Sequence, residues 1–211
     1  YMTSHPRDMS EEVIKAVAEG EHICENFHVP FQAGSSEILR RMNRGYTKEK
    51  YLDLIKLIRQ YVPDAAITTD IIVGFPGETE EEFKELMEFV RWARFDRMGA
   101  FTYSEEDGTL SAMEYDDNID DETKQSRLSR LMRLQQDISA EIEAEKVGKI
   151  MKVIIDRKEG EYYIGRTEFS SPEVDPEVLI PVNEHELQTG CFYNVKITGA
   201  EEFDVYGSVV K

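Results

Sequence analysis

The sequence predicts an α/β domain followed by a small all-β domain. Three apolar stretches rich in β-branched or aromatic residues, at 27–31, 65–73 and 97–103, are separated by amphipathic stretches of helical length. This alternation is typical of parallel βα units with right-handed connections. A long amphipathic stretch at 122–147 follows, and the rest of the chain reads as short strands between turns. We therefore expect a parallel sheet, part of a TIM-like barrel, and then a small closed barrel.

The chain opens with a loop and a short helix. Residues 1–6 look like the end of a strand running into a loop, with no initiator-like start and no element in front of them. Ser10 is placed to cap a helix over 11–19, in which Val13, Ile14 and Val17 share one face. We expect this chain to be a fragment of a longer protein.

The first strand is expected at 27–31, where apolar and polar residues alternate. Pro30 suits a strand that lacks a neighbour on one side. Gln32 ends the strand, and a polar side chain at that position points toward any ligand lying over the sheet. Ser35 or its neighbour caps the next helix. His28 fits a hydrogen-bonded core histidine better than a catalyst.

Two helices are expected next. The first covers 37–42 and ends at the sequence Asn-Arg-Gly, which exposes cations, among them Arg44. The second begins after Thr47 and ends at Tyr61, before Pro63. Its apolar residues recur at helical spacing and face inward.

The stretch 71–83 combines the end of a strand, a tight turn and a capped helix. The apolar run before Gly74 predicts a strand buried on both faces. Gly74 and Gly77 flank a proline and force a sharp turn, and Thr79 with Glu82 forms a capping box for a helix over 80–94. α/β proteins bind ligands at such strand ends. A plain βα unit without a ligand fits the local pattern equally well.

A third strand is expected at 97–103 and is ended by a turn at 105–109. An acidic linker at 115–121 then leads to the long helix, which Gly148 ends. The remainder predicts five strands of a barrel of the OB kind. These strands are expected at 150–156, 162–167, 177–181, 192–198 and 203–210.

Charge and composition limit the classes of function that the chain can have. The 211 residues carry a net charge of -18, which argues against clamping a nucleic-acid backbone and favours a basic protein partner or simple solubility. The same charge weakens an RNA-binding interpretation of the barrel. Cys24 and Cys191 lie far apart and form neither a disulfide framework nor a metal motif. Because no stretch approaches the ~20 apolar residues that span a bilayer and no signal peptide is visible, we expect a cytoplasmic protein with no membrane partner.

Several motifs resemble the radical-SAM methylthiotransferases. They are HVPFQAGS at 28–35, RMNRGYT at 41–47, TDIIVGFPGET at 69–79 and RFD at 94–96. Residues 1–146 then correspond to the C-terminal portion of the radical-SAM domain with its linker helix, and residues 147–211 to the TRAM domain. The resemblance implies a parent enzyme that uses S-adenosyl-L-methionine and two 4Fe-4S clusters. One cluster cleaves the cofactor to a 5'-deoxyadenosyl radical and the other supplies sulfur.

Two branches of this family share the resemblance. Motifs at 103–109, 165–175 and 202–207 look like the branch that methylthiolates an aspartate of small-subunit ribosomal protein S-twelve. Motifs at 3–6 and 28–35 look more like the branch that modifies isopentenyladenosine in tRNA. The barrel meets the substrate in this family, and an acidic surface suits a basic ribosomal protein. We therefore expect the ribosomal-protein branch, with tRNA as the alternative.

The family's CxxxCxxC motif is absent from this sequence, and the two cysteines match no cluster-binding position. The cluster ligands are therefore not in this chain, and we expect no catalysis by it alone. Two other interpretations stay open. One is a non-catalytic module that only docks the substrate. The other is an ordinary TIM-like enzyme, for which no nucleophile and base or metal-ligand cluster is visible.

The resemblance assigns cofactor-binding roles to eight residues. Gln32, Ser35, Thr69 and Asp70 are expected to meet the ribose and amino-acid parts of S-adenosylmethionine, and Arg44 its carboxylate. Phe101 and Tyr103 are expected to face the adenine. Gly74 is expected to allow close backbone approach. For Asp70 an ion pair or turn cap, and for Phe101 a place in the core, are equally compatible with the sequence.

Overall fold

The computed structural model describes residues 3–171, 175–182, 186–201 and 204–210. The chain forms two compact units, with the division after Gln135 inside a long helix; Cys24–Asn26 groups with the second unit. The predicted fold class, a parallel-sheet α/β segment followed by a small all-β barrel, is confirmed. Within the described residues no helix is long and apolar enough to cross a membrane.

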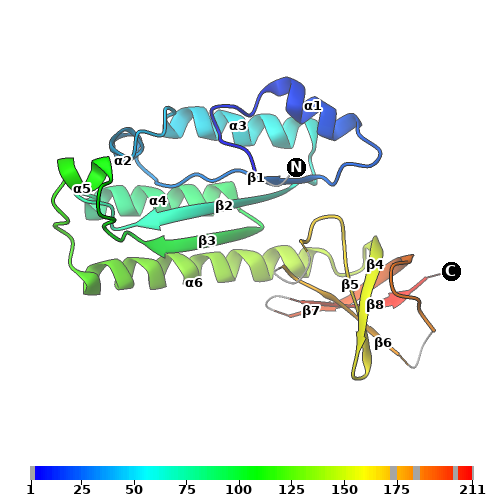
Figure 1. Ribbon diagram of the computed structural model, residues 1–211. Helices are drawn as coiled ribbons and strands as arrows, with labels where there is room; N and C mark the ends of the chain where they lie inside the picture. The colour runs from blue at the N-terminus through cyan, green and yellow to red at the C-terminus, as the bar shows by residue number, and fades with distance from the viewer. Residues whose placement is uncertain (1–2, 172–174, 183–185, 202–203, 211) are drawn as a thin grey trace. The chain divides into compact units, whose positions relative to one another are not determined.

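The first unit contains a three-stranded sheet in the order β1-β2-β3 (Figure 1). Its strands are β1 (Asn26–His28), β2 (Ala66–Val73) and β3 (Arg97–Thr102). β2 and β3 are parallel, with Asp70 paired to Gly99 and Ile72 to Phe101. The first strand is shorter than the predicted 27–31, because Pro30 has no N–H to donate and pairing beyond His28 returns only as a single bridge between Gln32 and Ile71.

Six helices accompany this sheet among the described residues. They are α1 (Glu11–Glu19), α2 (Ser36–Arg41), α3 (Lys48–Tyr61), α4 (Glu80–Ala93), α5 (Leu110–Glu114) and α6 (Asp121–Glu145). Ser10, Ser35, Thr47 and Thr79 cap the first four, and the capping box between Thr79 and Glu82 is complete. The short helix α5, capped by Thr109, was not predicted.

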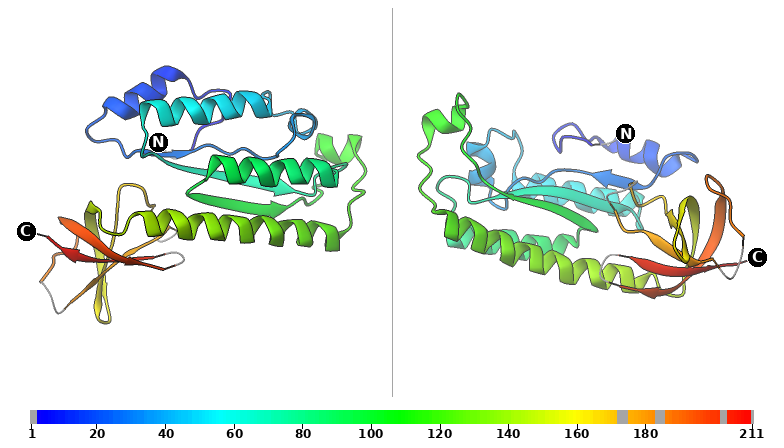
Figure 2. Two further views of the ribbon diagram at one scale, coloured as in Figure 1. Left: turned by 180° about the vertical axis from the view of Figure 1, so that it is seen from behind. Right: turned by 60° about the horizontal axis from the view of Figure 1, so that its bottom comes forward.

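Helices cover one face of the sheet. Figure 1 shows the sheet in front of α4, and the view from behind in Figure 2 shows α4 in front of the sheet. On the covered face, Thr69, Ile71 and Val73 are buried, and the ring of Phe31 lies 4.4 Å from the rings of Tyr51 and Phe89. Thr68, Asp70 and Ile72 alternate with these residues and are only half-buried. The expectation that this strand is buried on both faces was wrong, because no described helix of this unit covers its second face.

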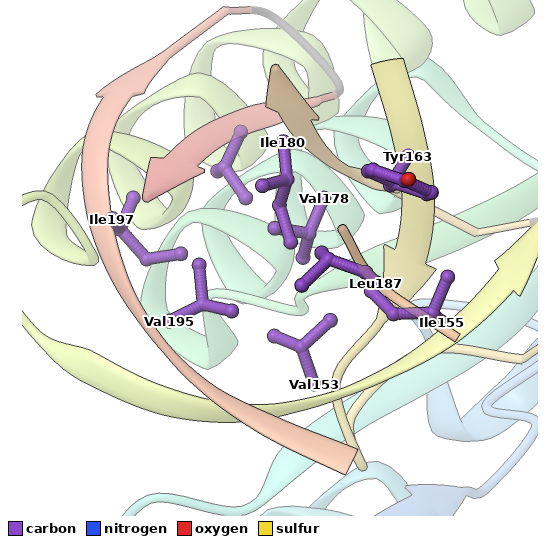
Figure 3. Close-up of a cluster of buried hydrophobic side chains, with 9 residues drawn as sticks. Val153, Ile155, Tyr163, Val178, Ile180, Leu187, Val195 and Ile197 are labelled. Carbon is purple, nitrogen blue, oxygen red and sulfur yellow. The ribbon is translucent and has the colours of Figure 1, made fainter. Parts of the chain in front are cut away.

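The second unit is a closed barrel in the order β4-β5-β6-β8-β7. Its strands are β4 (Ile150–Glu159), β5 (Tyr162–Arg166), β6 (Val178–Pro181), β7 (Phe192–Ala200) and β8 (Val205–Val209). Their inward side chains form one apolar core, in which Figure 3 shows Val153, Ile180 and Val195 pointing toward one another. All five predicted strands are therefore present in this unit. Phe203, the predicted start of the last strand, lies outside the described residues.

Candidate functional site

The open face of the sheet brings together an imidazole and a carboxylate from neighbouring strands. His28 of β1 contacts Thr68 through Nδ1 at 2.8 Å and Asp70 through Nε2 at 3.2 Å. Because Thr68 and Asp70 are two residues apart in β2, they point to the same face as one another. The side chains of His28 and Asp70 stay partly exposed. His28 is hydrogen-bonded, as predicted, but it lies partly exposed on this face and not in the core.

Gly99 of β3 makes room for the Asp70 carboxylate. A Cβ added at Gly99 would lie 2.5 Å from Asp70 Oδ1 and 3.3 Å from the Phe101 ring, so the carboxylate lies directly over the glycine. Phe101 is 58% exposed and points to the same face. The site therefore offers an acceptor carboxylate beside an accessible aromatic ring. Sequence reasoning missed Gly99, although a glycine inside a strand signals close approach of another group.

Gln32 and Arg44 form a second part of the site. Gln32 has φ of +75°, an uncommon conformation for a residue with a side chain. Its backbone is held on β2, since its N–H donates to the Asp70 carbonyl and its carbonyl accepts from the Ile72 N–H. Its side-chain oxygen accepts a hydrogen bond from Arg44 at 2.8 Å. Strain of this kind persists where surrounding contacts fix it, and it is common at ligand sites.

Arg44 also carries a donor that the described residues leave unused. Its Nε is buried and has no hydrogen-bond partner among them. A buried polar atom without a partner is costly, and such atoms commonly await a ligand or water. A guanidinium with a free donor suits a carboxylate. Arg44 is therefore joined to Gln32, whose backbone N–H donates to the carbonyl of Asp70 on β2.

Ser35 and Thr69 lie away from this face. The Ser35 hydroxyl caps α2 and donates to Glu82 at 2.7 Å, so both of its roles lie within the protein. The Thr69 side chain is 1% exposed and faces the helices. Its hydroxyl donates to the Val29 carbonyl and accepts from the Phe31 N–H. Both residues hold the first strand and its helix in place, and their predicted contact with a cofactor stays a prediction.

The turn after β2 is occupied by the protein's own side chains. Gly74 has φ of +72°, and a Cβ there would lie 2.5 Å from the Lys124 side chain of α6. Its N–H donates to Glu78 Oε2 at 2.8 Å, and Glu78 is paired with Arg127 at the same distance. Burial raises the pKa of Glu78, against the opposing effects of the Gly74 N–H and Arg127. In this structure the close approach predicted at Gly74 is made by Lys124.

Tyr103 lies at the carboxyl edge of the sheet, directly after β3. Its hydroxyl is hydrogen-bonded to Ser111 Oγ at 2.9 Å, and its ring meets the Phe75 ring edge-on at 5.1 Å. Lys124 Nζ lies 5.6 Å from the centre of the Tyr103 ring. Tyr103 therefore ties α5 to the sheet edge. Its predicted contact with adenine stays a prediction.

The site fits S-adenosylmethionine better than it fits an iron–sulfur cluster, the other cofactor that the resemblance implies. S-adenosylmethionine carries a carboxylate, an ammonium group, ribose hydroxyls and an adenine ring, and the Arg44 donor, the Asp70 acceptor and the exposed Phe101 ring match these groups chemically. Iron–sulfur clusters are held by cysteine thiolates. Among the described residues no three His, Cys, Asp or Glu side chains are grouped to hold a metal ion. The residues present therefore fit S-adenosylmethionine and do not fit a cluster.

Comparison with known families matches both parts of the chain. Residues 1–90 match the radical SAM superfamily and residues 147–210 match the TRAM domain. Among solved structures, the fold resembles that of coproporphyrinogen III oxidase HemN of Escherichia coli, which is described as a radical SAM enzyme. The TM-score is 0.55 at 19% identity, over 64% of this chain and 31% of that one. This likeness concerns the fold alone.

Curated relatives match nearly the whole chain. The chain is 51% identical over 207 residues to a protein of Phocaeicola vulgatus named ribosomal protein uS12 methylthiotransferase RimO, covering 98% of this chain and 48% of the relative. Proteins of the same name from Cytophaga hutchinsonii and Flavobacterium johnsoniae are 47% and 46% identical, covering 99% and 98% of this chain. The chain spans about half the length of these relatives.

Proposed function

We propose that this chain serves as the carboxyl-terminal part of an enzyme that methylthiolates an aspartate of small-subunit ribosomal protein S-twelve. Its motifs and relatives make it a member of the radical-SAM methylthiotransferases. The observation that carries the proposal is the 51% identity over 98% of the chain to relatives that bear this activity in their name. The chain spans about half of those relatives, so the activity belongs to the proposed whole enzyme.

Within that enzyme, the open face of the sheet binds S-adenosylmethionine. Arg44, held by Gln32, directs its free Nε toward the carboxylate of the cofactor. Asp70, fixed by His28, accepts hydrogen bonds from the ammonium group or the ribose hydroxyls. Phe101 provides a flat apolar surface for the adenine. Ser35, Thr69, Gly74 and Tyr103 support this face from the sheet and its edge.

The bound cofactor supplies the 5'-deoxyadenosyl group for radical chemistry in the proposed enzyme. The contribution of this chain is to bind and orient it. The Gln32 backbone is bonded to Asp70 and Ile72 of β2, so the proposed donor for the carboxylate and the proposed acceptor for the rest of the cofactor are held on one strand. Such anchoring holds reacting groups in a productive geometry and removes the entropy cost of finding it. The Gln32 strain is tolerated because these bonds over-determine its backbone.

A titration of the ¹⁵N-labelled chain with S-adenosylmethionine, followed by NMR, tests the cofactor part of the proposal. Amide shifts are expected to move at the carboxyl half of β2 and around Gln32 and Arg44. The change Arg44→Gln is expected to weaken the apparent affinity about ten- to a hundredfold, since a charge-assisted hydrogen bond contributes ~1.5–3 kcal/mol. Arg40→Gln, which removes an exposed guanidinium of α2, is the matched control. Equal weakening by both changes overturns the assignment of Arg44.

The iron–sulfur clusters are expected to be bound by parts of the proposed enzyme outside this chain. Cys24 and Cys191 are both exposed and free. Anaerobic reconstitution with iron and sulfide, followed by measurement of both elements, is expected to yield no stoichiometric cluster on this chain. Incorporation of four iron atoms per chain would contradict this.

The substrate is proposed from charge and relatives together. A net charge of -18 attracts a basic ribosomal protein and repels the phosphate backbone of tRNA. The motif at 28–35, which resembles the tRNA-modifying branch, keeps tRNA as the second candidate. Selective binding of the chain to S-twelve over an anticodon-stem tRNA, at physiological salt, tests this choice.

A further inference from the structure

An acidic segment follows the last strand of the parallel sheet. Nine of the eighteen residues from 105 to 122 are Asp or Glu, and none is Lys or Arg. The segment contains α5, which lies near the ends of β2 and β3 in the views of Figures 1 and 2. Those strand ends border the candidate cofactor site. The net charge of the chain is therefore concentrated beside this site.

Helix α5 is amphipathic, and its apolar side points away from the protein. Ser111 and Tyr115 anchor it, through the hydrogen bond to Tyr103 and an edge-on contact with the Phe75 ring at 5.9 Å. Leu110 and Met113 lie on the other side and are 60% and 71% exposed. Residues three and four apart share a helix face, so Glu114 lies beside them. We call Leu110 and Met113 the apolar ridge.

The carboxylates near the ridge are not used inside the protein. Within the described part of the chain, no ion pair engages the exposed side chains of Glu105, Glu106, Asp107, Glu114 or Asp116. By contrast, Asp117 pairs with Lys124, and Asp120 accepts hydrogen bonds from Thr123 at the start of α6. The acidic side chains that face solvent around the ridge are therefore available to cations of a partner.

We propose that the apolar ridge and its unpaired carboxylates dock a Lys- and Arg-rich segment of the protein substrate that carries an apolar side chain. Charge complementarity selects this occupant, because the ridge has apolar contact area and acceptors but no cation of its own. A nucleic acid is excluded by the same charges. The identification of the partner as S-twelve rests on the proposed function. Docking here brings the substrate to the carboxyl edge of the sheet, next to the cofactor face.

Four variants of the full chain separate the two parts of this surface. Glu105→Gln with Glu106→Gln removes two unpaired carboxylates of the acidic segment, and Glu81→Gln with Glu88→Gln removes two exposed carboxylates of α4 as the matched control. Met113→Ser removes half of the ridge, and Met132→Ser, an exposed methionine of α6, is its control. Circular dichroism and unfolding curves establish that each variant keeps the fold. Each is titrated with purified S-twelve and, separately, with a twelve-residue Lys/Arg/Leu peptide at two salt concentrations.

We expect the ridge variants to weaken binding of S-twelve about three- to tenfold, with little change in the controls. The variant with Glu105→Gln and Glu106→Gln is also expected to make the affinity less dependent on salt, whereas Met113→Ser weakens binding equally at both salt concentrations. If these variants bind S-twelve as tightly as the unchanged chain does, the proposed docking role of the ridge is overturned and the proposed function stays intact. Ridge-dependent binding of the basic peptide without binding of S-twelve supports the ridge and counts against the proposed substrate. If the chain binds neither S-twelve nor the basic peptide, the proposed role of the ridge is overturned.

Discussion

The side-chain oxygen of Gln32 accepts a hydrogen bond from Arg44 at 2.8 Å while the Gln32 backbone is held at φ of +75°. The two residues belong to different segments, the loop after β1 and the loop after α2. The backbone of Gln32 is fixed on β2 by bonds to Asp70 and Ile72. A strained residue thus connects the guanidinium to the strand that carries the acidic side chain of the site.

This relationship predicts opposite effects on stability and binding. Glycine adopts positive φ without strain, so Gln32→Gly is expected to leave the unfolding free energy unchanged or raise it by up to about 1 kcal/mol. The same change removes the partner of Arg44 and is expected to weaken binding of S-adenosylmethionine. Urea unfolding and the NMR titration measure the two effects.

Asn43→Gly is the control for this experiment. Asn43 has φ of +54° and is exposed, so the glycine relieves similar backbone strain away from the Gln32 side chain. It is expected to raise stability by a similar amount with no change in affinity. A Gln32→Gly variant that loses stability and keeps its affinity would show that Gln32 serves the fold and not the site.

The glycine under Asp70 predicts a second effect. A Cβ at Gly99 would lie 2.5 Å from Asp70 Oδ1, so Gly99→Ala is expected to displace that carboxylate and to separate it from His28. We expect overpacking to cost about 1–3 kcal/mol of unfolding free energy, together with a changed imidazole ¹⁵N spectrum of His28. Gly199→Ala, whose Cβ would make only ordinary contacts at 3.8 Å or more from Tyr206, is the strand control. An unchanged His28 spectrum in Gly99→Ala would contradict the proposed geometry.

The buried carboxyl of Glu78 predicts a dependence of stability on pH. Burial raises its pKa in the folded state above the ordinary value of 4.5, so the folded protein binds this proton more tightly than the unfolded chain does. The resulting stabilisation is fully present below pH 4.5 and is lost as the pH rises through the raised value.

Urea unfolding between about pH 4 and pH 8 measures this effect as a difference. As the pH rises, the unchanged chain is expected to lose unfolding free energy relative to Glu78→Gln, which cannot ionise there. Glu81→Gln, an exposed change in helix α4, which begins two residues after Glu78, controls for the loss of one negative charge. Parallel curves for the unchanged chain and Glu78→Gln would refute the assignment of this titration to Glu78.

Much of the fold follows from local patterns. Alternation, capping residues and turn glycines predicted the three parallel strands, the caps at Ser10, Thr47 and Thr79, and the five barrel strands, because these signals act within a few residues of one another. Helix α5 was missed because a five-residue helix without an inward apolar stripe carries almost no periodic signal. The shortening of β1 follows from Pro30. The sequence indicated that Pro30 limits strand pairing on one side, but not that the strand ends before it.

The site was harder to predict because its contacts are made between segments. Sequence reasoning placed Gln32 and Asp70 at strand positions facing a ligand. The structure joins Gln32 to Arg44 through the side chain and to Asp70 through the backbone. It did not distinguish Thr69 from Asp70, although adjacent residues of a strand point to opposite faces. Lys124, which packs against Gly74, comes from α6, and no local pattern encodes the proximity of that helix to the turn.

Competition between two ligands tests the central claim most directly. The chain is titrated with fluorescently labelled S-twelve at physiological salt, and unlabelled S-twelve or an anticodon-stem tRNA is then added as competitor. We expect unlabelled S-twelve to displace the label and tRNA to leave it bound, as a chain with a net charge of -18 should prefer a basic protein. Failure of S-twelve to bind, with saturable binding of the tRNA, would contradict the account and assign the chain to the tRNA-modifying branch.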